Sequence, residues 1–164
     1  MTEMLAGSRG SQTLSCFRMI MAAQALGLDM LGGVRREALV MGGALTITVR
    51  SERGAVIAAV TGEIDISTVP QLRERLFELA DNGGTLIVDL NRVTFIDSAG
   101  LGALVGTARR AAAHGGSLHA VCARPQTRKL LWMTGIDRRI PLTATVDGAL
   151  MLMGVSRDSS GSGT

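Results

Sequence analysis

An acid, a serine and two closely spaced glycines stand together in the segment IDSAGLG, residues 96–102. An apolar run ends at the acid, and apolar residues with helical spacing begin at Leu101. The pattern therefore predicts a helix that begins near Ala99, with Asp97 and Ser98 at its N-terminus. A serine there accepts a hydrogen bond from the unpaired N–H groups of the first turn, which is one sufficient interpretation of its residue type.

The same position also suits an anion. A helix N-terminus carries partial positive charge, so it tolerates a phosphate attached to the serine itself. Phosphorylation of Ser98 would add about −1.5 to −2 charge beside Asp97. A partner surface that fits the neutral hydroxyl would then meet two adjacent anions, which oppose burial unless a cation is supplied. Local chemistry leaves both interpretations open: a structural cap, or a phosphorylation site that switches binding.

Catalytic sites fit this segment less well. A nucleophile elbow requires glycine in place of Ile96, and neither His114 nor His119 has a spacing that indicates a catalytic triad. A dinucleotide fingerprint requires a small residue in place of Val105 and an acid about twenty residues later, where the chain reads SLHAVCA. No GxxxxGKS/T loop is present, and the only lysine is Lys129. The sequence therefore predicts a protein that is not an enzyme and needs no cofactor, with phosphate supplied to Ser98 by another protein.

Composition argues against several other kinds of site. Aromatic residues make up 2% of the chain, and the net charge of +3 comes from residues that form no long basic run, so no direct nucleic-acid binding is expected. Cys16 and Cys122 stand in no metal-binding spacing, which argues against a metal site and a disulfide framework. No run of eighteen apolar residues exists, so we expect no membrane span and a cytoplasmic location.

The chain divides into three zones by pattern. Residues 1–43 are rich in Gly and Met and contain one plausible helix, 17–31; residues 44–153 have the size of one domain; and residues 154–164 have the Ser/Gly composition of a flexible tail. Two hypotheses account for residues 1–43. Translation begins at Met41, which an intact-mass measurement would test, or the segment is a helical arm for contact with a partner or with a second copy.

Strand-like and helix-like periods alternate within residues 44–153. Strands are predicted at 45–50, 55–65, 85–90 and 117–123 and near 140–142. A helix is predicted from a capping box at Thr68 and Gln71 to Asp81. Further helices are predicted from Ala99 to 113, from 124 to Gly135 and over 145–153. The second strand is apolar on both faces and is expected to be central, and NRVTF, residues 91–95, is expected to be a turn. The order predicts an α/β fold with one mixed central sheet and about four helices.

Three segments together resemble a STAS domain of the bacterial anti-sigma-factor antagonist family. They are VTGEIDISTVPQLRERL (60–76), LIVDLNRVTFIDSAGLGALV (86–105) and RKLLWMTGIDRRIPLTATVDGAL (128–150). On this resemblance, Gly62, Glu63 and Asp65 correspond to the family's glycine-acid-x-aspartate element, and Asp97, Ser98, Gly100, Leu101 and Gly102 correspond to its phosphoacceptor loop. Many members carry Ser or Thr immediately after the acceptor, whereas this chain has Ala99, which assigns the acceptor to Ser98.

The resemblance implies a partner-switching cycle that regulates transcription. The unphosphorylated protein would bind an anti-sigma factor that is itself a serine kinase, phosphorylation of Ser98 would break the complex, and a phosphatase would restore it. The alternative is a sensory or scaffold STAS module, in which residues 1–43 carry an input or assemble a homo-oligomer.

Roles for the neighbouring residues also follow from the resemblance. Asp97 would set the loop and add to the repulsion, and Leu101 is expected in the partner-binding loop. Asp65 either shapes the docking surface or caps the turn before Thr68. Gly100 and Gly102 permit either close approach of the partner or a tight turn and helix packing.

Overall fold

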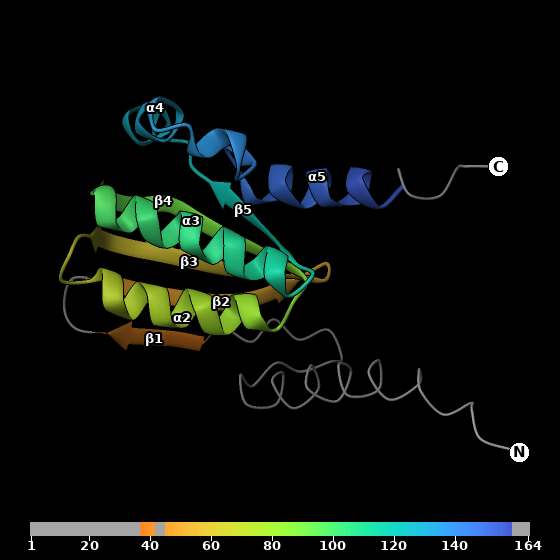
Figure 1. Cartoon of the computed structure of the whole chain (residues 1–164), viewed down its shortest axis with the longest axis horizontal. Coiled ribbons are helices and arrows are strands. Elements are labelled where there is room, and N and C mark those ends of the chain that lie inside the picture. Colours follow the sequence, from red (N-terminus) through yellow and green to blue (C-terminus); the bar gives the residue numbers. More distant parts are fainter. Residues whose placement is uncertain (1–36, 42–44, 159–164) are drawn as a thin grey trace, which may run out of the picture.

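One six-stranded sheet organises the part of the chain that a computed structural model describes, residues 37–41 and 45–158 (Figure 1). The strands are β1 Glu37–Met41, β2 Leu45–Glu52, β3 Ala55–Ile64, β4 Thr85–Ile96, β5 Ser117–Val121 and β6 Leu142–Thr143, and they lie side by side in chain order. β1, β2 and β3 pair antiparallel, and β3 to β6 pair parallel. The predicted α/β fold with one mixed sheet is confirmed, and β3 lies inside the sheet as expected.

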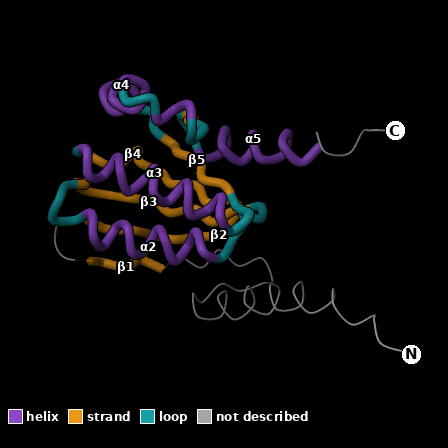
Figure 2. Tube along the Cα trace, viewed as in Figure 1, coloured by secondary structure: helices purple, strands orange, loops and turns teal. Residues whose placement is uncertain are grey.

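Helices lie on both faces of this sheet. They are α2 Val69–Asp81, α3 Ser98–Ala113, α4 Pro125–Met133 and α5 Val146–Asp158, with a 3-10 helix at Ile136–Arg138. Figures 1 and 2 show α2 and α3 side by side across one face. Ile57 and Ile87 pack with α5, whereas the next residues, Ala58 and Val88, belong to the cluster formed with α2 and α3. Because alternate strand residues point to opposite faces, α5 covers the other face.

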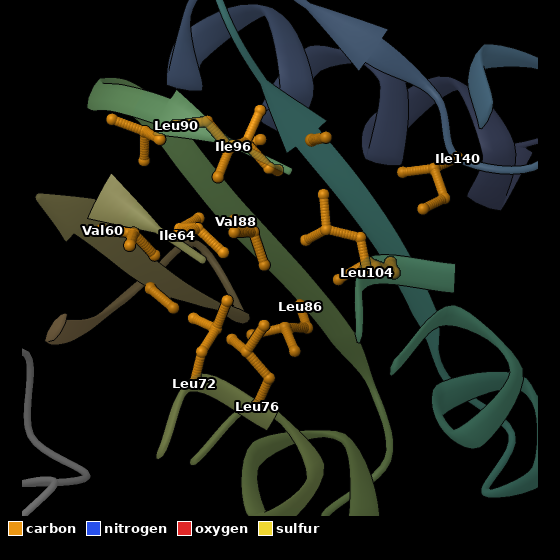
Figure 3. Close-up of a cluster of buried hydrophobic side chains, with 14 of the residues drawn as sticks. Val60, Ile64, Leu72, Leu76, Leu86, Val88, Leu90, Ile96, Leu104 and Ile140 are labelled. Atoms are coloured by element: carbon orange, nitrogen blue, oxygen red, sulfur yellow. The ribbon is translucent and has the colours of Figure 1, made fainter. Parts of the chain in front are cut away.

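The main core lies between the sheet and helices α2 and α3 (Figure 3). Leu72 and Leu76 of α2 meet Ile64 of β3 and Val88 of β4, and Leu104 contributes from α3; all five side chains are fully buried. Burial of a side chain of this size stabilises the fold by about 1.5–3 kcal/mol relative to leaving it exposed. These contacts hold α2 and α3 on the strands whose ends carry the predicted site.

Strand β4 is longer than the sequence predicts, and the expected turn at residues 91–95 is wrong. β4 continues to Ile96, with register shifts against β3 between Ala59 and Thr61 and between Gly62 and Glu63. Asn91 interrupts the apolar pattern because its side chain has another use: its Oδ1 accepts a hydrogen bond from the Ala123 N–H at 2.6 Å. Asn91 is therefore polar because it contacts the loop after β5. Strand β4 continues past it to Ile96, next to the predicted site.

The start of α2 also differs from its prediction. The hydroxyl of Thr68 accepts a hydrogen bond from the Asp65 N–H at 2.9 Å and donates to the Glu63 carbonyl at 3.0 Å, so it makes no capping bond to the first turn of the helix. The predicted capping box with Gln71 is therefore wrong, because the hydroxyl is turned back toward the preceding loop. Pro70 lies in the first turn, and the helix ends before Gly83, as expected.

The two ends of the domain differ from the pattern-based boundaries. β1 lies inside residues 1–43, where an extension was expected, and α5 continues past 153 into the expected tail. The predicted helix at 17–31 lies outside the described residues. In the described part of the chain, no helix has the length and apolar character needed to cross a membrane.

His119 of β5 provides a pH test of the fold. Its side chain is buried, its Nδ1 has no hydrogen-bond partner among the described residues, and burial lowers its pKa below the ordinary value of 6.5. Below pH 6.5 the unfolded chain therefore binds more protons at this residue than the folded chain. The free energy of unfolding decreases as the pH is lowered through this range. Urea denaturation at about pH 7.5 and pH 5.5 is expected to show a smaller pH dependence for His119→Leu than for the native chain.

Leu118, the buried residue next to His119 in β5, supplies the matched control for this test because its side chain has no titratable group. Leu118→Ala is expected to keep the native pH dependence. An identical pH dependence in the native chain and in His119→Leu would show that His119 is not the group responsible.

Candidate functional site

Two loops meet at the end of the sheet where β3 and β4 finish. Ile64 and Ile96 are paired as parallel neighbours, and the Asp97 N–H donates to the Ile64 carbonyl at 3.1 Å. The loop that begins at Asp65 and the loop that carries Asp97 and Ser98 therefore adjoin. We call this region, formed by residues 65–67 and 95–98 with the first turn of α3, the Ser98 end.

Asp97, and not Ser98, caps helix α3. Asp97 has an extended backbone, and its Oδ1 accepts a hydrogen bond from the Gly100 N–H at 2.9 Å. Ser98 is the first helical residue; its side chain is exposed and makes no hydrogen bond with any described residue. The structural cap therefore does not explain the serine, and its hydroxyl is accessible without the loss of an internal contact.

The capping role of Asp97 leads to a prediction about the free energy of unfolding. Asp97→Ala removes the acceptor for the Gly100 N–H and is expected to lower the free energy of unfolding by about 1 kcal/mol. Asp97→Asn keeps a side-chain oxygen in the same place and is the matched control, expected to retain most of that stability. Urea denaturation measures both changes, and equal losses in the two variants would contradict the assignment of Asp97 as the cap.

Gly100 and Gly102 have different surroundings, which separates their two possible roles. A Cβ on Gly100 would lie 2.5 Å from Cγ2 of Ile64 and 2.8 Å from Cγ1 of Ile96, closer than real Cβ atoms approach. Gly100 therefore allows the first turn of α3 to pack directly on the ends of β3 and β4. Gly102 is exposed, and a Cβ there would meet nothing within 4 Å. Helix packing thus accounts for Gly100 and leaves Gly102 without a packing reason.

Leu101 was expected in the partner-binding loop, and the structure places its side chain in the main core. It is 8% exposed, so its visible role is to hold α3 on the sheet. Of the predicted site residues, Ser98 and Gly102 are exposed and Asp65 and Asp97 are partly exposed, whereas Gly100 and Leu101 are buried.

Asp65 organises the loop between β3 and α2. Its Oδ1 accepts hydrogen bonds from the Ser67 N–H at 2.8 Å, the Ser67 hydroxyl at 2.6 Å and the Thr68 N–H at 3.1 Å. These bonds, the Ser67 hydroxyl first among them, lower the pKa of Asp65 below its ordinary value. Asp65 therefore performs the local capping role and also leaves a carboxylate charge at the Ser98 end.

Two exposed apolar side chains at the Ser98 end were not predicted as site residues. Ile66 is 80% exposed beside Asp65, and Phe95 is 52% exposed at the end of β4. Large exposed apolar side chains that gather near one site are typical of protein contact surfaces. Phe95 was missed because residues 91–95 were expected to form a turn, where side-chain direction has no fixed alternation. The Ser98 end thus combines an exposed hydroxyl, carboxylates and apolar side chains.

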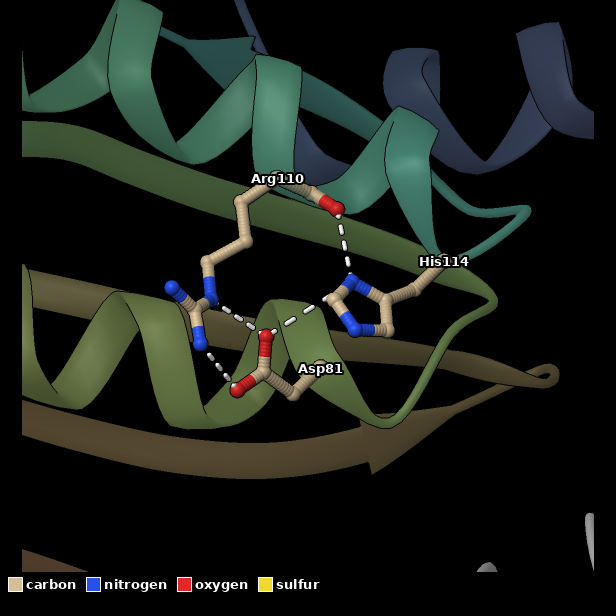
Figure 4. Close-up of polar contacts among 3 residues, drawn as sticks. All are labelled: Asp81, Arg110 and His114. Atoms are coloured by element: carbon tan, nitrogen blue, oxygen red, sulfur yellow. Dashed lines mark hydrogen bonds and ion pairs between the residues drawn. The ribbon is translucent and has the colours of Figure 1, made fainter.

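A polar cluster fixes the far end of α3 against α2 (Figure 4). Arg110 donates to both carboxylate oxygens of Asp81, with Nη2 to Oδ2 at 2.7 Å, and His114 Nδ1 lies 3.6 Å from Asp81 Oδ1. Arg110 also lies over the ring of Phe77, with Cζ 4.9 Å from its centroid. These contacts lie at the opposite end of α3 from Ser98, so they orient the helix without joining the exposed site.

Comparisons with known proteins agree with this architecture. The family model described as STAS domain matches residues 46–149. The anti-sigma-B factor antagonist of Bacillus subtilis is 32% identical over 106 residues, which cover 65% of this chain and 97% of that protein. The anti-sigma-F factor antagonist RsfB of Mycobacterium tuberculosis is 35% identical over 109 residues, covering 65% and 87%.

A solved structure is similar over the same region. The crystal structure of an anti-sigma factor antagonist from Mycobacterium paratuberculosis superimposes with a TM-score of 0.62 and 31% sequence identity. The match covers 70% of this chain and 97% of that chain. The similarity therefore spans nearly the whole of these relatives and includes the segment that forms the Ser98 end.

Proposed function

Since the chain belongs to the STAS-domain family and its similar relatives are anti-sigma-factor antagonists, we propose that it binds an anti-sigma factor serine kinase through the Ser98 end. Phosphorylation of Ser98 by that kinase ends the binding, and a phosphatase restores it. The protein acts through protein contacts in the cytoplasm and has no catalytic step of its own. Sigma-factor-dependent transcription is the process that it regulates.

The observation that carries this proposal is the state of the Ser98 hydroxyl. It is exposed at the first turn of α3, and the cap is supplied by Asp97 instead. A phosphate on this oxygen would lie at the positive end of a helix whose first-turn N–H groups favour anions. The folded domain therefore accommodates the modification, and the change is confined to the surface.

Charge and apolar contact explain why a phosphate would end the binding. The Ser98 end already carries the carboxylates of Asp65 and Asp97 beside the apolar side chains of Ile66 and Phe95. A partner that covers this region must remove water from it. An added charge of about −1.5 to −2 beside the existing carboxylates makes that desolvation unfavourable unless the partner supplies cations.

Phosphopeptide mass spectrometry tests the direction of phosphate transfer. The purified chain is incubated with ATP alone and with ATP plus the anti-sigma factor kinase that it binds. We expect phosphate on Ser98 only when the kinase is present, and none on a Ser98→Ala chain. Labelling with ATP alone would overturn the claim that the phosphate is supplied by another protein, and unchanged labelling of Ser98→Ala would overturn the choice of acceptor.

A further inference from the structure

Helix α4 and the 3-10 helix that follows carry an exposed surface that the switch at Ser98 does not use. Trp132 is 69% exposed and Met133 is 68% exposed, and they are the last two residues of α4. The cations Arg128, Lys129, Arg138 and Arg139 are all exposed in the same segment. We call these six residues the α4 patch.

The patch concentrates positive charge. Residues 124–139 contain five cations, with Arg124 added to the four above, against the single acid Asp137, which gives a net charge of +4 for a segment of a chain whose total is +3. The side chains of the four patch cations make no hydrogen bond or ion pair with any residue that the structure describes. Their charge is therefore available to an outside group.

Three residues of the patch border a hollow. Arg128, Lys129, Trp132, Asp137 and Leu142 line a hollow of about 470 Å³. The hollow therefore offers room for an outside side chain beside Arg128, Lys129 and Trp132.

We propose that the α4 patch docks an acidic segment of a partner protein. Carboxylates of that segment pair with the four cations, and an apolar side chain packs against Trp132. Trp, Met and Arg are the residue types enriched at the centres of protein interfaces. This contact goes beyond the proposed switch, because no patch residue belongs to the Ser98 end.

The shape and charge of the patch favour a protein segment over an anionic membrane surface. A bilayer surface also attracts cations and exposed Trp. The flat surface of a bilayer, however, does not fill the hollow bordered by Arg128, Lys129 and Trp132. A peptide chain presents both carboxylates and apolar side chains, and those side chains fit a hollow.

Fluorescence of Trp132 tests the proposal directly, because it is the only Trp in the chain. The probe is a Trp-free synthetic peptide in which Asp and Glu flank two leucines, and the control peptide has Asn and Gln in place of the acids. We expect a saturable emission shift with the acidic peptide only. Arg128→Glu/Lys129→Glu is expected to weaken this binding at least about tenfold, with a loss of its salt dependence.

A second pair of exposed cations supplies the matched control. Arg73→Glu/Arg109→Glu changes the net charge equally on α2 and α3 and is expected to keep native affinity for the peptide. If the first double variant does not fold, Arg138→Gln/Arg139→Gln replaces it with the same expected weakening. An absent shift, equal weakening by the control pair, or a shift with phosphatidylglycerol vesicles but not with the peptide would each overturn the proposal.

Discussion

Ser98→Asp is expected to bind the anti-sigma partner about a hundredfold more weakly than the native chain, whereas Ser98→Ala is expected to bind with near-native affinity. The aspartate places a permanent charge beside Asp97 at the exposed first turn of α3, where the partner must displace water. An unpaired charge buried in an interface costs about 2–5 kcal/mol of binding free energy. A hundredfold change in affinity corresponds to about 2.7 kcal/mol, which lies within this range. Alanine removes a hydroxyl that makes no hydrogen bond with the described residues, and it adds no charge at this position.

Ser51→Asp is the matched control for this result. Ser51 is exposed in β2 at the opposite end of the sheet from Ile96, so the variant adds the same charge away from the Ser98 end. Isothermal titration calorimetry should find native affinity for Ser51→Asp, and thermal unfolding should show that all three variants are folded. Equal binding by Ser98→Ala and Ser98→Asp would contradict the switch and favour a scaffold role.

Gly100→Ala is expected to lower the free energy of unfolding by about 1–3 kcal/mol, the usual cost of overpacking a core. The added methyl group would lie 2.5 Å from a methyl carbon of Ile64 and 2.8 Å from Ile96, and both side chains are buried. Alanine has a higher helix propensity than glycine by about 1 kcal/mol, which offsets only part of this cost. The first turn of α3 must therefore move away from the strand ends.

Gly102→Ala separates packing from helix propensity. It makes the same substitution in the same helix, but the new methyl group meets nothing within 4 Å. We expect its free energy of unfolding to stay equal to that of the native chain or to rise by up to about 1 kcal/mol. Urea denaturation of the pair is decisive: equal changes in stability would show that close packing on Ile64 is not the reason for Gly100.

The order of the elements follows from the sequence because local patterns determine it. Alternating residues of one sheet face are apolar in β2, both faces are apolar in β3, and the spacing of leucines in α2 matches one helix face. These patterns need no knowledge of distant contacts. The continuation of β4 through the polar residue Asn91 does depend on a distant contact, because the Asn91 side chain accepts a hydrogen bond from the N–H of Ala123, thirty-two residues later.

The site itself was predictable as a location but not as a set of roles. Asp and Ser are both good helix caps, so the sequence did not say which of Asp97 and Ser98 would be used. The two glycines of the loop look equivalent in sequence, and only their distances to Ile64 and Ile96 separate them. Ile66 became a site residue through its exposure, which residue type alone does not reveal.

The affinity of one anti-sigma partner for the chain before and after phosphorylation of Ser98 tests the central claim most directly. Calorimetry would compare the unmodified chain, the chain phosphorylated on Ser98 and the same sample after phosphatase treatment. We predict that the unmodified chain binds tightly and that the phosphorylated chain binds more weakly by about a hundredfold or more. Phosphatase treatment is expected to restore the binding. Equal affinity before and after phosphorylation of Ser98 would contradict the account.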